Sequence, residues 1–402
     1  MKDQTIISLA LRRAGGATLQ EFQRQRGLYP SGEGDILTME QLMPYLVGYR
    51  RYRVRLGDSF DSIARQFSTT VRAISTANPG TDSRRLRPGQ ILIVPLGFSV
   101  VPTDIPFTSE LLGLCIEGLS MRYPFISSRR LTVTAYGRPV TLLKIGEGST
   151  SVLYNASHHA NEWITTPLLM KFLEEYAQAI SRGLRLWDRD ARALFRRTQL
   201  YLVPMVNPDG VDLVTGAITE NMAEYDSAQN IAARFPAIAF PEGWKANLLG
   251  VDLNLNYPAG WEQAKENKYA LGYDQPAPRD FVGSEPLDQA ESAAMVRLTQ
   301  EVSPRLTLSY HSQGRVIYWK FKDIEVPEGR KIGTAFANSS GYTLEDTPFA
   351  SGFAGYKDWF IQEYNRPGYT IEVGLGENPL PLSQFDQIYG DNLGILTQGL
   401  YL

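Results

Sequence analysis

The chain has 402 residues, more than one ordinary hydrophobic core holds, so two or more domains are expected. Its hydrophobic content of 43% and charged fraction of 21% are those of a soluble globular protein. No stretch approaches the roughly 18 apolar residues of a membrane span. The single cysteine, Cys115, excludes an intramolecular disulfide framework and a cysteine-rich zinc site.

The net charge of −3 is unevenly distributed. Residues 1–97 contain 14 basic and 8 acidic residues, a balance of +6, which leaves −9 for the remainder. The excess of basic residues in this part of the chain favours binding to an anionic polymer such as cell wall. Nucleic acid is not expected as a partner, because the arginines are scattered among apolar residues. The start of the chain, a short apolar run before Arg12 and Arg13, makes a poor secretory signal, so we expect a cytoplasmic protein or a processed wall protein.

Residues 1–50 predict a short helical segment. Phe22, Gly27, Asp35 and Leu42 follow a pattern similar to the helical peptidoglycan-binding repeat that often precedes cell-wall hydrolases. The segment is shorter than a complete repeat. A helical hairpin that only packs on its neighbour is therefore an equal alternative.

Residues 51–97 predict a strand, two helices and a second strand. Asp58 or Ser59 can cap the first helix, and Asn78-Pro79 breaks the second. The apolar run from Ile91 to Pro95 completes the pattern, which resembles a LysM module. The resemblance implies a βααβ fold that binds N-acetylglucosamine-containing glycans.

After a proline-containing linker, residues 98–402 alternate between strand-like and helix-like segments. Strands are expected at residues 131–136, 141–145, 151–154 and 199–205, and a helix at residues 163–179. This alternation predicts an α/β/α domain in which helices cover a central sheet.

Two polar clusters follow strand-like runs of this domain. His158, His159 and Glu162 come after residues 151–154, and His311 comes after residues 306–310. Strands that end at one edge of a sheet bring such residues together. An open catalytic zinc site needs three protein ligands of these types. A histidine and a glutamate three residues apart are, taken alone, better explained as a polar helix start, and His158 competes with His159 for the ligand position.

Further blocks appear in a fixed order: Asn207-Pro208-Asp209-Gly210, Trp244-Lys245-Ala246-Asn247, Gly250-Val251-Asp252-Leu253-Asn254-Leu255-Asn256, His311-Ser312 and Thr370-Ile371-Glu372-Val373. With the run from His158 to Pro167, they make residues 105–402 resemble the M14 zinc metallocarboxypeptidases, which have a mixed central sheet. The closest likeness is to bacterial γ-D-glutamyl-L-diamino acid endopeptidases, which also carry LysM modules. The resemblance implies cleavage of the bond between D-glutamate and diaminopimelate or lysine in peptidoglycan or muropeptides.

The resemblance also assigns roles to single residues. It implies one zinc ion with three protein ligands: His159, Glu162 and His311. Glu372 matches the general base, and its apolar strand would raise its pKa and make it a better proton acceptor. Asp252 matches the carboxylate that hydrogen-bonds the first zinc histidine and fixes its ring. Lys245 best matches the arginine that stabilises the oxyanion.

Departures from the family pattern concern the substrate. Leu255 stands where peptide-cleaving carboxypeptidases have an arginine that binds the terminal carboxylate, and Asn161 replaces an arginine between two ligands. A bidentate anchor for a free C-terminus is therefore missing, which disfavours the alternative of a carboxypeptidase that trims C-terminal residues. Asn254 remains as a substrate-binding candidate. The other alternative, an inactive wall-binding protein, is disfavoured because the ligands and Glu372 are retained.

The stretch from Ser351 to Trp359 resembles the loop that shapes the pocket on the leaving-group side. Lys357 falls near the bottom of that pocket and would pair with the distal carboxylate of diaminopimelate, with a solvent-exposed lysine as an equal alternative. The mobile tyrosine of the family has no clear match, because alignment places Phe349 or Ala350 there. Tyr356 is the candidate for the missing hydroxyl.

Overall fold

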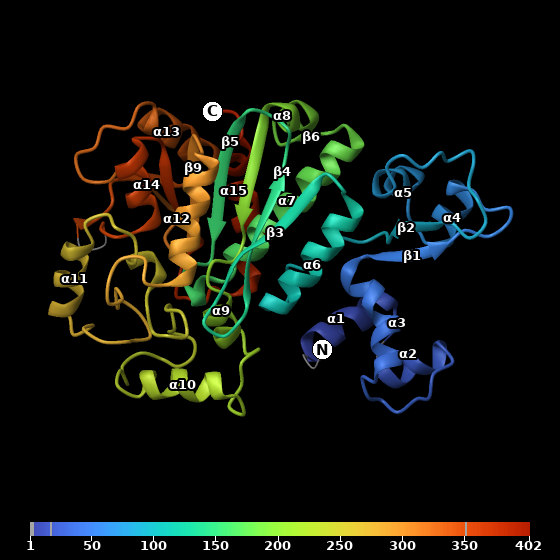
Figure 1. Cartoon of the computed structure of the whole chain (residues 1–402), viewed down its shortest axis with the longest axis horizontal. Coiled ribbons are helices and arrows are strands. Elements are labelled where there is room, and N and C mark those ends of the chain that lie inside the picture. Colours follow the sequence, from blue (N-terminus) through green and yellow to red (C-terminus); the bar gives the residue numbers. More distant parts are fainter. Residues whose placement is uncertain (1–3, 17, 350–351) are drawn as a thin grey trace. The chain divides into compact units, whose positions relative to one another are not determined.

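The computed structural model describes residues 4–16, 18–349 and 352–402 (Figure 1). The chain forms two compact units. The first contains the chain up to residue 106 together with residues 110–127 and 174–184, and the second contains residues 107–109, 128–173 and 185–402. Among the helices of the described ranges, none has the length and apolar character to cross a membrane.

The first unit begins with three helices, α1 (Gln4–Ala14), α2 (Leu19–Gln25) and α3 (Ile36–Val47). The Thr18 side chain accepts a hydrogen bond from the Glu21 N–H and caps α2. Asp35 caps α3 in the same way through the Thr38 N–H. These caps explain why α2 begins at Leu19 and α3 at Ile36.

The same unit continues with β1 (Tyr49–Arg53), α4 (Phe60–Gln66), α5 (Val71–Ala77) and β2 (Ile91–Pro95). The two strands pair antiparallel, and Ser59 caps α4. Asn78 ties α5 to β2, because its amide donates to the carbonyls of Ile74 and Ile93 and its oxygen accepts from the Ile93 N–H. The element order is the predicted strand, helix, helix and strand.

The second unit is built on a sheet that has eight strands within the described ranges, in the order β11-β10-β12-β9-β5-β8-β4-β3. The strands are β3 (Ile126–Val133), β4 (Pro139–Ile145), β5 (Thr150–Ala156), β8 (Thr198–Val203), β9 (Leu306–Ser312), β10 (Val316–Tyr318), β11 (Thr343–Glu345) and β12 (Gly368–Val373). The central strands β12, β9, β5 and β8 are parallel, whereas β10 is antiparallel to β12 and β4 to β8. This confirms the predicted mixed α/β sheet.

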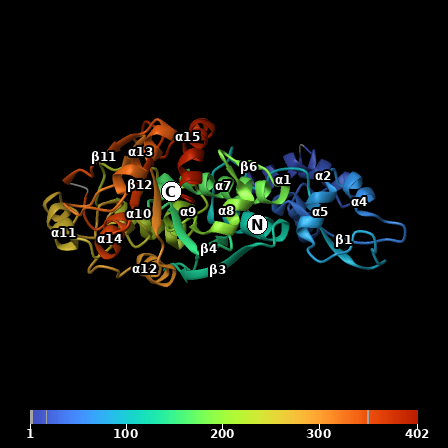
Figure 2. The same cartoon turned by 90° about the horizontal axis from the view of Figure 1, so that it is seen from above.

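Helices cover both faces of this sheet (Figures 1 and 2). On one face lie α7 (Thr165–Arg182), α13 (Gly329–Ser340) and α15 (Phe385–Gln398), and on the other α12 (Ala290–Val302) and α14 (Tyr356–Tyr364). The alternation of side chains along β5 explains the layers. Leu153 packs into the core shared with α12 and α14, whereas Tyr154 contacts Phe172 of α7 and donates to the Leu396 carbonyl of α15.

Other elements of the described ranges lie between these strands and helices in the sequence. They are α6 (Ser109–Arg122), η1 (Ala160–Glu162), β6 (Arg185–Leu186), β7 (Arg189–Asp190), α8 (Ala191–Arg197), α9 (Pro208–Val214), α10 (Ala223–Ala232), η2 (Leu253–Leu255), α11 (Trp261–Ala270) and η4 (Leu382–Gln384). The strand expected at residues 131–136 ends at Val133. Thr134 then accepts from the Gly137 N–H in a turn in which Gly137 has a φ of 81°, a conformation that favours glycine.

The carboxyl ends of the parallel strands carry the polar blocks of the sequence. The run from Ser157 follows β5 directly, Asn207 comes shortly after β8, and His311 lies near the end of β9. In the register of β12 and β9, Glu372 stands opposite His311. The sheet therefore gathers these residues at one edge, where open α/β sheets bind their ligands.

Candidate metal centre and active site

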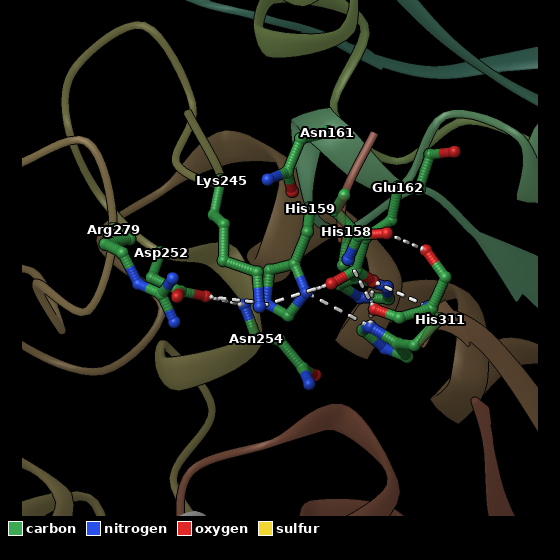
Figure 3. Close-up of polar contacts among 12 residues, drawn as sticks. His158, His159, Asn161, Glu162, Lys245, Asp252, Asn254, Arg279 and His311 are labelled. Atoms are coloured by element: carbon green, nitrogen blue, oxygen red, sulfur yellow. Dashed lines mark hydrogen bonds and ion pairs between the residues drawn. The ribbon is translucent and has the colours of Figure 1, made fainter. Parts of the chain in front are cut away.

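Three side chains converge at this edge of the sheet (Figure 3). Nδ1 of His159 lies 2.9 Å from Oε1 of Glu162, and Nδ1 of His311 lies 2.9 Å from Oε2 of the same carboxylate. The two Nδ1 atoms are 3.2 Å apart. All three residues can present a ligand atom within 4.8 Å of the others.

Local structure explains how the triad forms. Ala160 to Glu162 make the single 3-10 turn η1, for which His159 is the preceding cap residue. One turn brings the side chains of His159 and Glu162 to the same side. His311 reaches them because β9 pairs in parallel with β5, the strand that ends just before this turn.

The donor set fits a zinc ion. Nε2 of His159 lies 3.0 Å from Oδ1 of Asp252, which can accept the Nε2 proton and leave the Nδ1 lone pair for a metal. Burial disfavours a protonated His159, but Glu162 and Asp252 outweigh it and raise the pKa of His159 to about 9. The site thus attracts positive charge, and its two nitrogens and one carboxylate are the ligands of a catalytic zinc.

His158 has a different position. Its buried ring contacts the Tyr257 hydroxyl through Nε2 at 2.9 Å and stacks on His311, with ring centroids 5.8 Å apart. Burial and the two neighbouring histidines hold the pKa of His158 well below its usual value. Of the two competing histidines, the structure brings His159 to Glu162, and His158 packs as a neutral ring behind His311.

Glu372 and Lys245 flank the triad. The half-buried carboxyl of Glu372 projects from β12, and burial together with the charge of Glu162 raises the pKa of Glu372 to about 8. Nζ of Lys245 lies 3.2 Å from Oε1 of Glu162. Burial opposes a charged Lys245, but Glu162 and Asp252 outweigh it and raise the pKa of Lys245. The pair provides a proton acceptor and a fixed cation.

A single cavity of about 560 Å³ contains these groups. The predicted site residues that line it are His159, Asn161, Glu162, Lys245, Asp252, Asn254, His311, Lys357 and Glu372. Asn161 donates to the Glu242 carbonyl at 3.3 Å, and its Oδ1 is buried with no hydrogen-bond partner in the described structure. Asn254 accepts from the Tyr356 N–H at 3.0 Å. Leu255 also lines the cavity.

Tyr356 is placed differently from the prediction. Its side chain is fully buried, and its hydroxyl lies 2.7 Å from the Thr299 hydroxyl in the core beneath the site. Tyr356 is not among the residues that line the cavity, because it is the first residue of α14 and turns its ring inward. Its hydroxyl therefore cannot replace the mobile tyrosine. Of the neighbouring positions, Ala350 and Ser351 lie outside the described residues.

Lys357 lies at the cavity wall but is not a free cation. Its ammonium donates to the Lys320 carbonyl at 2.7 Å and to the Thr347 hydroxyl at 3.0 Å. It also lies 2.5 Å from Oδ1 of Asp358, and both side chains are 4% exposed. The solvent-exposed alternative does not hold, and Asp358 compensates the charge that was expected to meet diaminopimelate.

Other cavity residues had no signal in the sequence. Lys268, Arg279 and Asp280 form a charged group on one wall, and Tyr318 of β10 lies near Glu372. None of these positions belongs to a recognisable block or to a periodic pattern. Lys268 lies in α11, Arg279 and Asp280 lie between α11 and α12, and Tyr318 lies in β10, so only the folded chain brings these residues together.

Asn207 joins two of the other polar blocks of the sequence. Its amide donates to the His158 carbonyl at 3.1 Å and to the Ala246 carbonyl at 3.0 Å. The Ala160 N–H donates to the Lys245 carbonyl. These bonds hold the ligand segment against the segment that carries Lys245. A Cβ on Gly210 would lie 2.6 Å from the Ala246 carbonyl oxygen, so only glycine fits there.

Comparisons with known proteins agree with the fold and the site. The family described as zinc carboxypeptidase matches residues 115–394, and the LysM domain matches residues 52–95. γ-D-Glutamyl-L-diamino acid endopeptidase 1 of Lysinibacillus sphaericus is 45% identical over 287 residues, which cover 71% of this chain and 70% of that protein. Uncharacterized protein YqgT of Bacillus subtilis is 41% identical over 281 residues, 69% of this chain and 73% of that one.

A solved structure shows the same fold at low identity. Bovine thrombin-activatable fibrinolysis inhibitor, in complex with tick carboxypeptidase inhibitor, matches with a TM-score of 0.55 and 17% identity. The match covers 73% of this chain and 95% of that chain. The chain, with its zinc-ligand triad at the edge of a carboxypeptidase-like sheet, therefore belongs to the zinc carboxypeptidase family and carries a LysM domain ahead of the enzyme.

Proposed function

We propose that this protein is a zinc-dependent γ-D-glutamyl-L-diamino acid endopeptidase that hydrolyses peptidoglycan stem peptides. The observation that carries the proposal is that the ligand triad, Glu372 and Lys245 line one cavity. The name of the Lysinibacillus relative supports the choice of bond. The LysM domain supports a wall glycan containing N-acetylglucosamine as the docking partner.

The chemistry follows from the residues of this cavity. Zinc held by His159, Glu162 and His311 would supply a Lewis acid and lower the pKa of water. Glu372 accepts a proton from the attacking water and later delivers it to the leaving amine, a task that suits a carboxyl with a raised pKa. Lys245 stabilises the negative charge that develops on the carbonyl oxygen.

The residues that line the cavity support cleavage of a bond within the stem peptide over removal of a C-terminal residue. Leu255 and Asn161 line the cavity at positions where peptide-cleaving carboxypeptidases have arginines, and the arginine missing at Leu255 is the one that would bind a terminal carboxylate. An apolar side chain and a neutral amide do not provide such an anchor. Asn254 and Lys357 belong to the proposed binding site for the diamino acid. The proposal covers both diaminopimelate and lysine at this position.

The compartment is part of the proposal. The enzyme acts in the cytoplasm, on recycled fragments or during sporulation, or in the wall if the chain is processed. Cell fractionation distinguishes the two settings, because LysM docking on intact wall is possible only in the second.

Mass spectrometry of products from defined muropeptides tests the function. Release of L-Ala-D-Glu from an L-Ala-γ-D-Glu-diaminopimelate peptide is the expected result. Release of only a terminal D-alanine would show a carboxypeptidase instead. The variant Glu162→Gln is the control: we expect it to lose zinc and turnover together. Full glycan binding with no turnover by the wild-type protein would favour an inactive wall-binding protein.

A further inference from the structure

We propose that Arg279, next to Lys245, binds the free α-carboxylate of the γ-D-glutamyl residue on the acyl side of the scissile bond. The inference rests on the proposed function, because a γ-linked glutamyl residue carries an unbonded α-carboxylate and an ordinary α-linked residue does not. It makes Arg279 a specificity-determining residue of the cavity.

The guanidinium of Arg279 is available to a ligand. Its Nε donates to Oδ2 of Asp280 at 2.6 Å, which is the only hydrogen bond of this side chain within the described ranges. The side chain is 41% exposed and lines the cavity of the zinc-ligand triad. The two terminal nitrogens are therefore free to form the paired hydrogen bonds with which arginine binds a carboxylate.

Arg279 shares its carboxylate partner with a second cation. Asp280 is the shared partner of Arg279 and Lys268, so one carboxylate faces two cations. Asp252, the next carboxylate, is engaged by His159. An anion that enters this part of the cavity thus meets a guanidinium whose carboxylate partner also serves Lys268, in contrast to the wall near Lys357, whose ammonium has Asp358 to itself.

The backbone fixes Arg279 close to the place where the acyl carbonyl must react. The Lys245 and Ala246 N–H groups both donate to the Pro278 carbonyl, one residue before Arg279. Lys245 in turn reaches the ligand Glu162, and Arg279 lies beside Asp252 (Figure 3). In a γ-glutamyl residue, two methylene groups and the α-carbon separate the scissile carbonyl from the α-carboxylate. The α-carboxylate is therefore never far from the scissile carbonyl. Arg279, beside Lys245, lies in the part of the cavity where this carboxylate is expected.

A purely positioning role would use the same contacts. The Asp280 N–H donates to Oδ2 of Asp252 at 3.3 Å, so Arg279 could act only by holding Asp280 and, through Asp252, the ring of His159. Such a role would affect zinc binding and all substrates alike. A binding role affects only substrates that carry the α-carboxylate.

Two peptides that differ only at this group separate the roles. One is L-Ala-γ-D-Glu-diaminopimelate, and the other carries the α-carboxamide, D-isoglutamine. The zinc-loaded wild-type enzyme should prefer the carboxylate peptide in kcat/KM. In Arg279→Gln the ratio of the two kcat/KM values should fall by about 10-fold or more, the effect of a charged hydrogen bond. Arg279→Lys should give an intermediate ratio, since the charge remains without the planar fork.

Arg330→Gln is the control for loss of a surface charge, because Arg330 is exposed on α13 outside this cavity. It should keep the wild-type ratio. Equal losses on both peptides in Arg279→Gln, with weakened zinc binding, would overturn the inference in favour of positioning. A wild-type enzyme with no preference would also overturn it. If the wild type cleaves neither peptide at the γ-bond, the proposed function itself fails and the inference with it.

Discussion

Two carboxylates in one cavity have opposite shifts in pKa. For Glu162, His159 and Lys245 outweigh the effect of burial and hold the pKa well below its usual value. For Glu372, burial dominates, the charge of Glu162 adds to it, and the pKa rises to about 8. The first carboxylate therefore stays charged as a ligand, whereas the second can take up and release protons near neutral pH.

Replacing Glu372 by glutamine should remove the proton acceptor and keep the shape of the site. We expect turnover of a γ-D-glutamyl peptide to fall about 10³-fold, within the range for lost general-base catalysis. Zinc content should stay at the wild-type level, because Glu372 is not part of the triad. Steady-state kinetics and metal analysis of the same preparation check both points. A loss of less than tenfold would exclude Glu372 as the base.

Replacing Lys357 by methionine should destabilise the fold. The change leaves the buried Asp358 without its ion-pair partner, and an unpaired buried charge costs about 3 kcal/mol. The double variant Lys357→Met with Asp358→Asn should recover most of this loss, because no charge is stranded. Unfolding free energies from urea titrations measure both. Wild-type stability of the single variant would contradict the ion pair.

The same double variant is suited to test substrate choice. If Lys357 binds the distal carboxylate of diaminopimelate, the variant loses more activity on diaminopimelate peptides than on lysine peptides. The ratio of kcat/KM values for the two peptides is the measurement. Equal losses would show that this lysine serves the fold alone.

The sequence predicted the zinc site well and its surroundings less well. His159, Glu162 and His311 could be found because a metal needs few residue types, each placed after a strand. The direction of a side chain at the start of a helix, as at Tyr356, carries no such constraint. Arg279 and Asp358 escaped prediction because their roles depend on contacts with Asp280 and Lys357 in the folded cavity.

At the scale of elements, helix α12 begins with a buried ionisable residue. Glu291 is 2% exposed, and burial, with a further contribution from Asp209, raises its pKa from 4.5 to about 7. The folded state therefore binds this proton more tightly than the unfolded state. Stability is highest when the carboxyl is protonated and falls as the pH rises from about 4.5 to 7.

Glu291→Gln should remove this dependence, because the amide has similar size and no charge. Relative to the variant, the wild-type protein should lose roughly 3 kcal/mol, as an order of magnitude, between pH 4.5 and pH 8. Urea unfolding of both proteins at several pH values, followed for the second unit, is the measurement. Parallel stability curves would show that Glu291 does not titrate in this range.

Element order was easier to predict than element pairing. The alternation of strands and helices follows from hydrophobic periodicity, so the sheet and its helices could be expected from residues 98–402. The antiparallel strand β10 could not, because it contains only Val316 to Tyr318 and obtains its partners from β11 and β12, which are distant in sequence.

At the scale of the whole molecule, the LysM domain should raise activity on intact wall without changing the chemistry. Asn78→Ala removes one hydrogen bond to Ile74 of α5 and two to Ile93 of β2, and should unfold this small domain. We expect activity on purified wall to fall about 10²-fold through lost local concentration. The kcat/KM for a short soluble peptide should be unchanged.

Ser83→Ala is the matched control, since Ser83 is exposed in the same domain. It should behave as wild type on both substrates. A parallel decline on wall and soluble peptide in Asn78→Ala would show that the LysM domain supports the enzyme fold and not docking.

The assembly of the active site from β5, β9 and β12 has a consequence for synthesis. The ribosome synthesises His159 first and His311 much later. Glu372 follows only with β12, the last strand of the sheet in the sequence. A nascent chain on the ribosome lacks the proton acceptor until this strand has emerged and paired with β9. Copies that end before β12 therefore lack the proton acceptor and should not hydrolyse the stem peptide.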